Sequence, residues 1–293
     1  NNKYDHILGY LKHLGIKNSK IIKSELYCSP VIIYSDEIRY EDHISDLWVK
    51  VFDNFYEKIV SKKDSFNDTS VWKSSYTKEC IPKYEISDWV DGFIKKIDRY
   101  ITKNTSVLEI GCGNGLILKR VISRVKHYTG VDSSFFGIES IKNSSAFENN
   151  RHKILLHHCD ASEIDKINEG KYDLIILNSV IQYFSSTEYL LNLLSTLQQK
   201  VKPSTIIAIG DVRSFHTSDL HYYEIVKSRK NLKVYGEKLK NKINSLDKVE
   251  KETLYSPILF KTLHLFLNWI SATSVISKSS FHLNEMTKYR YDV

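Results

Sequence analysis

Residues 106–115 constrain the fold of this chain more than any other stretch. The sequence there is Ser-Val-Leu-Glu-Ile-Gly-Cys-Gly-Asn-Gly. Val107, Leu108 and Ile110 form a short apolar run that is typical of a buried parallel strand. The three glycines that follow predict a tight turn, because glycine adopts backbone dihedrals that a Cβ atom forbids. Since residues 116–126 have a helical pattern, the stretch predicts a strand, a glycine-rich turn and a helix, which together form a nucleotide-cofactor site.

Two features of this turn favour S-adenosylmethionine over a nicotinamide dinucleotide. The glycines lack the G-x-G-x-x-G spacing that seats a pyrophosphate on a helix N-terminus. Glu109 at the end of the strand would repel a pyrophosphate, whereas it would attract a cationic cofactor. The pattern E-x-G-x-G-x-G resembles motif I of class I methyltransferases, which implies that Glu109, Gly111 and Gly113 contact S-adenosylmethionine. A nicotinamide-linked oxidoreductase and an ordinary β-turn are the competing interpretations.

The alternation of strands and helices continues after the turn. Apolar runs predict four more strands, at residues 128–131, 154–158, 172–177 and 206–209, with a helix at 187–200 before the last of them. Repeated strand–helix units of this length predict an α/β fold with a doubly wound, mostly parallel sheet. This agrees with the Rossmann-like class I methyltransferase fold. Ligands of such sheets bind at the carboxyl ends of the strands.

Polar residues follow these strands where a cofactor would lie. Asp132 ends the second strand, where an acidic residue holds a ribose diol, and it is also placed to cap the next helix. Asp160 follows the third strand, where its carboxylate would accept the exocyclic amine of adenine. The candidate cofactor-binding residues at the strand ends are Asp132, Ser133, Asp160, Ala161, Asn178, Ser179 and Gln182.

The charge pattern argues against a nucleic-acid partner. The formal net charge is +7, but the lysines are dispersed and form no compact basic patch with interleaved aromatic residues. The richest stretch, residues 227–251, mixes its lysines with Glu237, Asp247 and Glu250. A mixed-charge run of this kind is typical of a solvated helix face, so we expect no nucleic-acid binding.

The cysteines and the apolar segments indicate a cytoplasmic protein. Cys28, Cys80, Cys112 and Cys159 are widely scattered and lack C-x-x-C spacing, so we expect reduced thiols and no bound metal. No run of about 20 apolar residues is present, so we expect no membrane-spanning helix. The chain shows no leader, begins Asn-Asn-Lys and ends within a β-like run, which suggests a piece of a longer polypeptide.

Three regions are expected along the chain. Residues 1–40 form a small N-terminal appendage, and residues 41–100 form a helical lid region. Residues 101–293 form the class I methyltransferase core, with an inserted helical segment at about 215–255.

The first hundred residues carry the patterns behind these boundaries. A short helix is expected at 7–14 and two strands within 20–35. Amphipathic helices are expected at 42–60 and 86–99, separated by the polar, aromatic loop 72–77. The apolar stripe of the first of these helices consists of Ile44, Leu47, Trp48, Val51, Phe52, Phe55 and Tyr56.

Four further motifs make the resemblance more specific. They are Trp-Lys-Ser-Ser-Tyr-Thr (72–77), Asn-Ser-Val-Ile-Gln-Tyr-Phe (178–184), Gly-Asp-Val-Arg-Ser (210–214) and Asn-Glu-Met-Thr-Lys-Tyr-Arg-Tyr-Asp-Val (284–293). Together they resemble the methyltransferase domains embedded in nonribosomal peptide synthetases and polyketide synthases, over roughly residues 42–293. The resemblance implies S-adenosylmethionine as methyl donor, and as partners an acyl carrier protein with a phosphopantetheine-tethered substrate and the neighbouring synthase domains. The loop 72–77 resembles the lid of this family over the cofactor, which adds Tyr76 to the candidate cofactor-binding residues.

Candidate catalytic residues lie in the second half of the core. A hydroxyl nucleophile gains from a general base, and histidine titrates near neutral pH. The family often carries a Phe-His pair in the helix after the fifth strand, and His221 lies closest to that position here. We therefore predict His221 as the base and Glu285 as the residue that orients it or shares its proton. An ordinary surface histidine and a capping glutamate are the plainer alternatives.

The residue pattern favours O-methylation of a hydroxyl on a carrier-bound intermediate of a polyketide synthase or hybrid synthetase. N-methylation in a nonribosomal peptide synthetase comes second, and C-methylation of a β-keto thioester third. A non-catalytic scaffold with the same fold is a further alternative, which the intact glycine motif and Asp132 disfavour. A buried pair between Asp211 and Arg213 is expected to fix the loop after the fifth strand.

Overall fold

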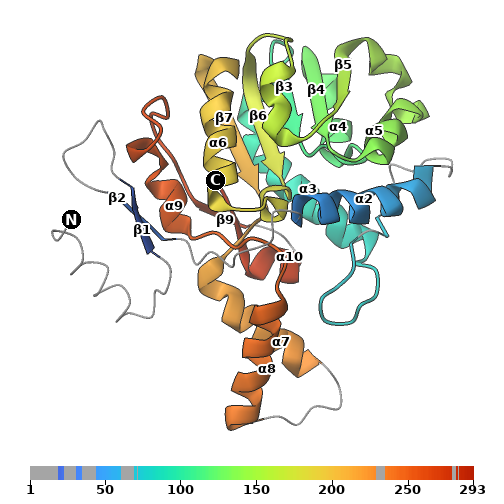
Figure 1. Cartoon of the computed structure of the whole chain (residues 1–293). Helices are drawn as coiled ribbons and strands as arrows, with labels where there is room; N and C mark the ends of the chain where they lie inside the picture. Colours follow the sequence, from blue (N-terminus) through green and yellow to red (C-terminus); the bar gives the residue numbers. More distant parts are fainter. Residues whose placement is uncertain are drawn as a thin grey trace.

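A five-stranded parallel sheet with the order β5-β4-β3-β6-β7 forms the centre of the protein (Figure 1). The computed structural model describes residues 19–22, 31–34, 44–60, 69–70, 72–228, 235–278, 282 and 284–293. The central strands are β3 (Ser106–Ile110), β4 (His127–Asp132), β5 (Ile154–His158), β6 (Tyr172–Asn178) and β7 (Val201–Gly210). The predicted doubly wound, mostly parallel sheet is confirmed. β7 begins earlier than expected because Val201 already pairs with Tyr172, before an irregularity in the register.

The last strand of the chain is the middle strand of a second, three-stranded sheet with the order β8-β10-β9. β10 (Arg290–Asp292) pairs antiparallel with β8 (Val212–Arg213) and with β9 (Ile276–Ser277). Ile209 and Val293 exchange two backbone hydrogen bonds of 2.8 Å, so the C-terminal end of the chain also borders β7. The residues around 290 therefore lie beside the carboxyl end of β7.

Helices cover both faces of the sheet because successive side chains of a strand point to opposite faces. Val107 belongs to a core cluster that includes α3 (Lys83–Ile97) and α4 (Leu116–Val121). The next residue, Leu108, belongs to a second cluster that includes α6 (Thr187–Leu197) and α9 (Pro257–Lys261). α5 (Phe135–Lys142) contributes Ile138 and Ile141 to the first cluster.

Two helices are shorter than their patterns suggested. The helix expected at 116–126 ends at Val121, because the chain turns back and Lys126 donates its amide to the Thr105 carbonyl beside β3. The helix expected at 187–200 ends at Leu197. Short 3-10 helices span Asp98–Tyr100, Ile122–Arg124, Ser145–Lys153, Ala161–Lys166, Ile181–Tyr183, Gln198–Lys200, Phe215–Thr217 and Leu263–Leu265.

The N-terminal elements confirm two of the early patterns. β1 (Ser19–Ile22) and β2 (Val31–Tyr34) are the two expected strands and pair antiparallel, whereas the helix expected at 7–14 lies outside the described residues. α2 (Ile44–Val60) packs against α5 near the carboxyl edge of the sheet. Its apolar stripe is only partly buried, because Leu47 and Val51 are 48% and 53% exposed.

α7 (Ser218–Ser228) and α8 (Gly236–Val249) pack against each other and extend away from the sheet (Figure 1). Both lie within the expected helical insertion at 215–255, and the three domain boundaries stay a prediction. The short helix α10 (Glu285–Lys288) follows α9 and leads into β10. In the described segments, no helix is long and apolar enough to cross a bilayer.

Candidate active site

The glycine turn after β3 has a conformation that glycine adopts readily and other residues do not. Gly111, Gly113 and Gly115 have φ angles of 77°, 51° and 86°. The Gly113 amide donates a 2.6 Å hydrogen bond to Asp132 Oδ2, and a Cβ atom at this position would lie 2.6 Å from the Tyr56 hydroxyl. Glycine is therefore required at position 113 by its backbone dihedrals and by the available space. The predicted tight turn is confirmed.

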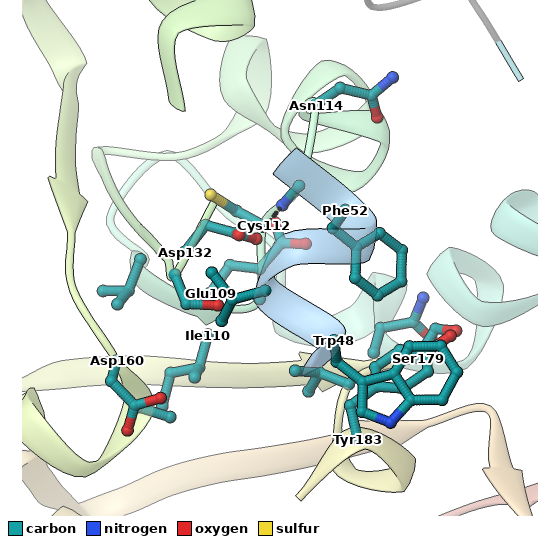
Figure 2. A pocket seen from close by; sticks show the side chains of 18 of the residues that line it. Trp48, Phe52, Glu109, Ile110, Cys112, Asn114, Asp132, Asp160, Ser179 and Tyr183 are labelled. Atoms are coloured by element: carbon teal, nitrogen blue, oxygen red, sulfur yellow. Dashed lines mark hydrogen bonds between the residues drawn. The ribbon is translucent and has the colours of Figure 1, made fainter. Parts of the chain in front are cut away.

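A pocket lies at the carboxyl edge of the sheet, between the strand ends and α2 (Figure 2). Of the candidate cofactor-binding residues, its wall contains Glu109, Gly111, Gly113, Asp132, Ser133, Asp160, Ala161, Asn178 and Ser179. The remaining candidates lie outside the described wall of the pocket, namely Tyr76, Gln182, His221 and Glu285. Gln182 lies behind this wall and hydrogen-bonds Ser179, whereas Tyr76 and Glu285 lie in a separate cluster around His221.

Glu109 places a buried carboxyl group in the pocket wall. It is 2% exposed and accepts a hydrogen bond from the Tyr128 hydroxyl. Burial raises the pKa of Glu109 to about 8, the Tyr128 hydrogen bond opposes this, and the nearby Asp132 adds to it. Because a buried carboxylate is costly without a counter-charge, this group is poised to receive a cation.

The two acidic residues at the neighbouring strand ends are already used in local hydrogen bonding. Asp132 accepts the Ser134 amide at 2.8 Å as well as the Gly113 amide. The alternative in which Asp132 caps the next helix is wrong, because the Ser134 side chain caps α5. Asp160 caps the turn that begins at Ala161 and also accepts the Tyr189 hydroxyl. The ribose and adenine roles of Asp132 and Asp160 stay predictions.

Aromatic side chains from outside the predicted site form much of the rest of the wall. Trp48, Phe52 and Tyr56 come from α2, and Tyr183 follows β6. The ring of Tyr183 lies 4.7 Å from that of Trp48 and 5.0 Å from that of Phe52 (Figure 2). We expected these α2 residues only as an apolar stripe. Their i, i+4, i+8 spacing places the three rings on one face of the helix. This spacing is the sequence signal that could have predicted an aromatic wall.

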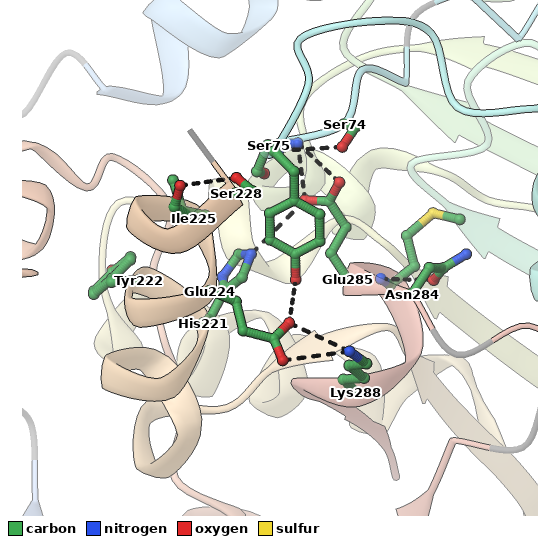
Figure 3. Close-up of polar contacts among 12 residues, drawn as sticks. Ser74, Ser75, His221, Tyr222, Glu224, Ile225, Ser228, Asn284, Glu285 and Lys288 are labelled. Atoms are coloured by element: carbon green, nitrogen blue, oxygen red, sulfur yellow. Dashed lines mark hydrogen bonds and ion pairs between the residues drawn. The ribbon is translucent and has the colours of Figure 1, made fainter. Parts of the chain in front are cut away.

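His221 lies in a cluster of polar side chains between α7 and α10 (Figure 3). It is 5% exposed on α7, and its Nε2 atom is 3.7 Å from Glu285 Oε2. Its Nδ1 atom is 3.3 Å from Arg213 Nη2, and its ring stacks on Tyr289 at 4.9 Å. Since a guanidinium only donates, Nδ1 is the accepting nitrogen and Nε2 carries the proton. The predicted neighbours His221 and Glu285 are thus brought together, but the lone pair of the imidazole faces Arg213.

Hydrogen bonds of Glu285 and Tyr76 connect the loop 72–77 to α10 and α7. Both carboxylate oxygens of Glu285 accept the Ser75 amide, at 2.8 and 3.0 Å (Figure 3). Burial alone would raise the pKa of Glu285, but contacts with His221, Ser75 and Ser74 lower it to about 2. The Tyr76 hydroxyl donates to Glu224 at 3.0 Å. These residues therefore hold the loop in place.

The expected pair between Asp211 and Arg213 is wrong. Both side chains are buried, but Asp211 pairs with Arg290, while Arg213 pairs with Glu250 and Glu252 at 2.7 and 2.8 Å. The reason is the left-handed backbone at Asp211, with φ of 65°, which interrupts β7 and β8. Within the described ranges, no three His, Cys, Asp or Glu side chains are grouped so as to hold a metal ion.

The fold is that of class I S-adenosylmethionine-dependent methyltransferases. The magnesium protoporphyrin IX methyltransferase ChlM of Synechocystis PCC 6803, solved with bound S-adenosylhomocysteine, superimposes with a TM-score of 0.52. The match covers 85% of this chain and 96% of that protein at 13% identity, so the similarity concerns the fold alone.

The family model described as "Methyltransferase domain" matches residues 101–259, which is more than half of the chain. The chain therefore belongs to the methyltransferase domain family.

Relatives of similar sequence are large synthetases. Chondramide synthase cmdD of Chondromyces crocatus is 30% identical over 253 residues, which cover 86% of this chain and 6% of that protein. Enniatin synthetase of Fusarium oxysporum is 30% identical over 233 residues, covering 77% of this chain and 7% of that protein. Nonribosomal peptide synthetase dtxS1 of Metarhizium robertsii is 27% identical over 263 residues, covering 86% and 3%. This chain thus spans only a small part of the length of these relatives.

Proposed function

We propose that this domain transfers a methyl group from S-adenosylmethionine to an amine of an aminoacyl group tethered to a carrier protein of a nonribosomal peptide synthetase. The observation that supports S-adenosylmethionine as the cofactor is the buried carboxyl of Glu109 in an aromatic-lined pocket. A sulfonium cation supplies the counter-charge that this carboxyl needs, and aromatic faces also attract cations. When bound, S-adenosylmethionine supplies an electrophilic methyl group.

The pocket residues suit the rest of this cofactor. The backbone at Gly111 and Gly113 leaves room for the methionine portion, because neither residue has a side chain. Asp132 lies at the end of β4 for the ribose, and Asp160 at the end of β5 for the adenine. These roles are part of the proposal.

The assignment of an amine as the methyl acceptor rests on the contacts of His221. A hydroxyl nucleophile needs a base, whereas a neutral amine already has a lone pair. The accepting nitrogen of His221 faces the permanent cation of Arg213, and the side chain lies outside the described pocket wall. The relatives named above support this choice, because they include nonribosomal peptide synthetases. O-methylation stays the second candidate, because His221 Nε2 and Glu285 Oε2 lie 3.7 Å apart, as two members of an acid–base pair would.

The carrier requirement is tested by comparing one acyl group in two forms. Tethering raises the effective concentration of the acceptor at the site to roughly the millimolar range. We expect methylation of an aminoacyl carrier protein to exceed that of the free amino acid by about 100-fold or more at equal micromolar concentrations. Intact-mass spectrometry measures both. Equal turnover of the two forms would rule out the assembly-line role, and exclusive methylation of a hydroxyacyl carrier would replace the amine by a hydroxyl.

His221→Ala separates the two acceptor classes. With a carrier-bound amine we expect a loss of less than about fivefold, because no general base is required. If a hydroxyl is the acceptor and His221 the base, turnover should instead fall about 100-fold to 10,000-fold. His264→Ala, an exposed histidine, is the matched control, and S-adenosylmethionine affinity reports whether the variant is folded. A large loss confined to hydroxyacyl turnover would restore O-methylation as the function.

A further inference from the structure

Two residues other than glycine adopt left-handed backbone conformations at the ends of neighbouring strands. Ser179 follows β6 with φ of 56°, and Asp211 follows β7 with φ of 65°. This conformation is unfavourable for a residue with a Cβ atom, so the surrounding structure must hold it. Here the β6–β7 ladder runs up to Asn178 and Gly210, and the Ser179 amide donates to the Gly210 carbonyl at 3.0 Å. The strained turn places Ser179 in the pocket wall.

The hydroxyl of Ser179 is held by a neighbouring side chain. Its oxygen accepts a hydrogen bond from Gln182 Nε2 at 3.0 Å. A serine hydroxyl has one donor and two acceptor positions, and this contact uses one acceptor. One lone pair of the Ser179 oxygen is left for a group that donates.

Asp211 is fixed as an anion behind Ser179. It is fully buried and accepts the Trp89 Nε1 proton at 2.8 Å. Burial opposes its ionisation, but the charges of Arg290 and Lys278 and the Trp89 hydrogen bond outweigh it and hold the pKa of Asp211 below its usual value. Asp211 is therefore a weak base, and Ser179 keeps its own proton.

The strand order places Ser179 at the acceptor end of the pocket. Along the edge of the sheet the order β5-β4-β3-β6 brings Asp160, Asp132, Glu109 and Ser179 into succession. Figure 2 shows Asp160 and Ser179 at opposite ends, with Glu109 between them and Trp48 beside Ser179. With the adenine at Asp160 and the sulfonium at Glu109, the next group along this line is the methyl acceptor.

We propose that the Ser179 oxygen accepts an N–H of the methyl-accepting amine, and that Gln182 is the positioning residue that orients it. This deepens the proposed function and rests on it. The assignment replaces the cofactor contact predicted for Ser179 by an acceptor contact. One N–H of the amine is bound by Ser179, which turns the nitrogen lone pair toward the methyl group.

The transfer balances without a protein base. The nitrogen lone pair forms the new N–C bond while the C–S bond breaks, and its electron pair returns to sulfur to leave a neutral thioether. The methylated nitrogen then carries the positive charge and loses one proton to solvent water. Ser179 keeps its own proton throughout.

Ser179→Ala and Ser179→Gly test this assignment with two residues that differ in how well they tolerate the backbone conformation at position 179. Both variants lack the hydroxyl, but glycine also relieves the unfavourable φ angle, so that this variant remains folded. We expect kcat/KM for the aminoacyl carrier protein to fall about tenfold to 100-fold in both, as for the loss of one orienting hydrogen bond. The Kd of S-adenosylmethionine should stay within about twofold of the wild-type value. Ser195→Ala, an exposed serine of α6, is the matched control.

The outcomes distinguish a failure of the Ser179 assignment from a failure of the proposed function. Wild-type turnover of the amine by both variants would overturn the role of Ser179 and leave the proposed function intact. An equal loss of S-adenosylmethionine affinity in both would return Ser179 to the cofactor and also overturn the inference. If the wild-type domain methylates no carrier-bound amine, the proposed function fails, and the role of Ser179 fails with it.

Discussion

Gly113→Val is expected to weaken S-adenosylmethionine binding by about 100-fold or more while the domain stays folded. A Cβ atom at this position would lie 2.6 Å from the Tyr56 hydroxyl, so the new side chain must displace the Tyr56 ring from its place in the pocket wall. The φ of 51° is also unfavourable for a β-branched residue. The two effects act on the pocket wall, because Gly113 and Tyr56 both belong to it. Calorimetry measures the affinity, and circular dichroism measures the melting temperature.

Gly170→Val is the matched control for this experiment. Gly170 has φ of 87°, but a Cβ atom there would meet nothing within 4 Å. Both variants should therefore lose about 1–2 kcal/mol of stability from the left-handed backbone, and only Gly113→Val should lose the cofactor. Normal affinity in Gly113→Val would show that the cofactor binds elsewhere.

Glu109→Gln is expected to weaken S-adenosylmethionine binding by about tenfold to 100-fold and S-adenosylhomocysteine binding by less than about threefold. The substitution keeps the size of the side chain and an oxygen that accepts the Tyr128 proton, but it removes the negative charge. Only the sulfonium compound is positively charged at sulfur. The variant therefore isolates the charge interaction from packing.

The same residue predicts how cofactor discrimination depends on pH. The pKa of Glu109 is raised to about 8, so its carboxylate fraction grows as the pH rises from 7 to 9. The affinity ratio of S-adenosylmethionine to S-adenosylhomocysteine should therefore rise over this interval and level off above it. Titrations in buffers of different ionisation enthalpy should show proton release on binding near pH 7. A surface variant, Glu148→Gln, should keep the pH dependence, whereas Glu109→Gln should lose it. A ratio that does not change with pH in the wild-type protein would contradict the role of Glu109.

Much of the central sheet could be predicted because its signals are local. The strand at 154–158 was predicted at its observed bounds, since an apolar run between polar segments is enough to specify a strand. The glycine turn was predicted for the same reason, because the dihedrals it needs are a property of glycine itself. The end of the helix after this turn was not, because it depends on the Lys126–Thr105 hydrogen bond between separate segments.

The candidate site shows the same division. The strand-end residues Asp132, Asp160 and Ser179 were expected at one edge, because parallel strands place their carboxyl ends together. The aromatic wall was not expected, because the α2 stripe does not reveal which structure it faces. Trp48 meets Tyr183 only once α2 has packed against α5.

The sequence by itself determined the doubly wound parallel sheet, the glycine turn and the edge at which ligands bind, since each follows from short-range periodicity and from the geometry of parallel strands. The methyltransferase class followed from the resemblance of its motifs to a known family. Only the tertiary structure decided the surroundings of His221 and Ser179. The partners of His221 are Arg213 of β8 and Glu285 of α10, and the backbone of Ser179 is held by Gly210 at the end of the next strand. Hydrogen-bond partners and charges of this kind come from segments far apart in the chain. Tertiary packing sets these partners, so no local sequence pattern predicts them.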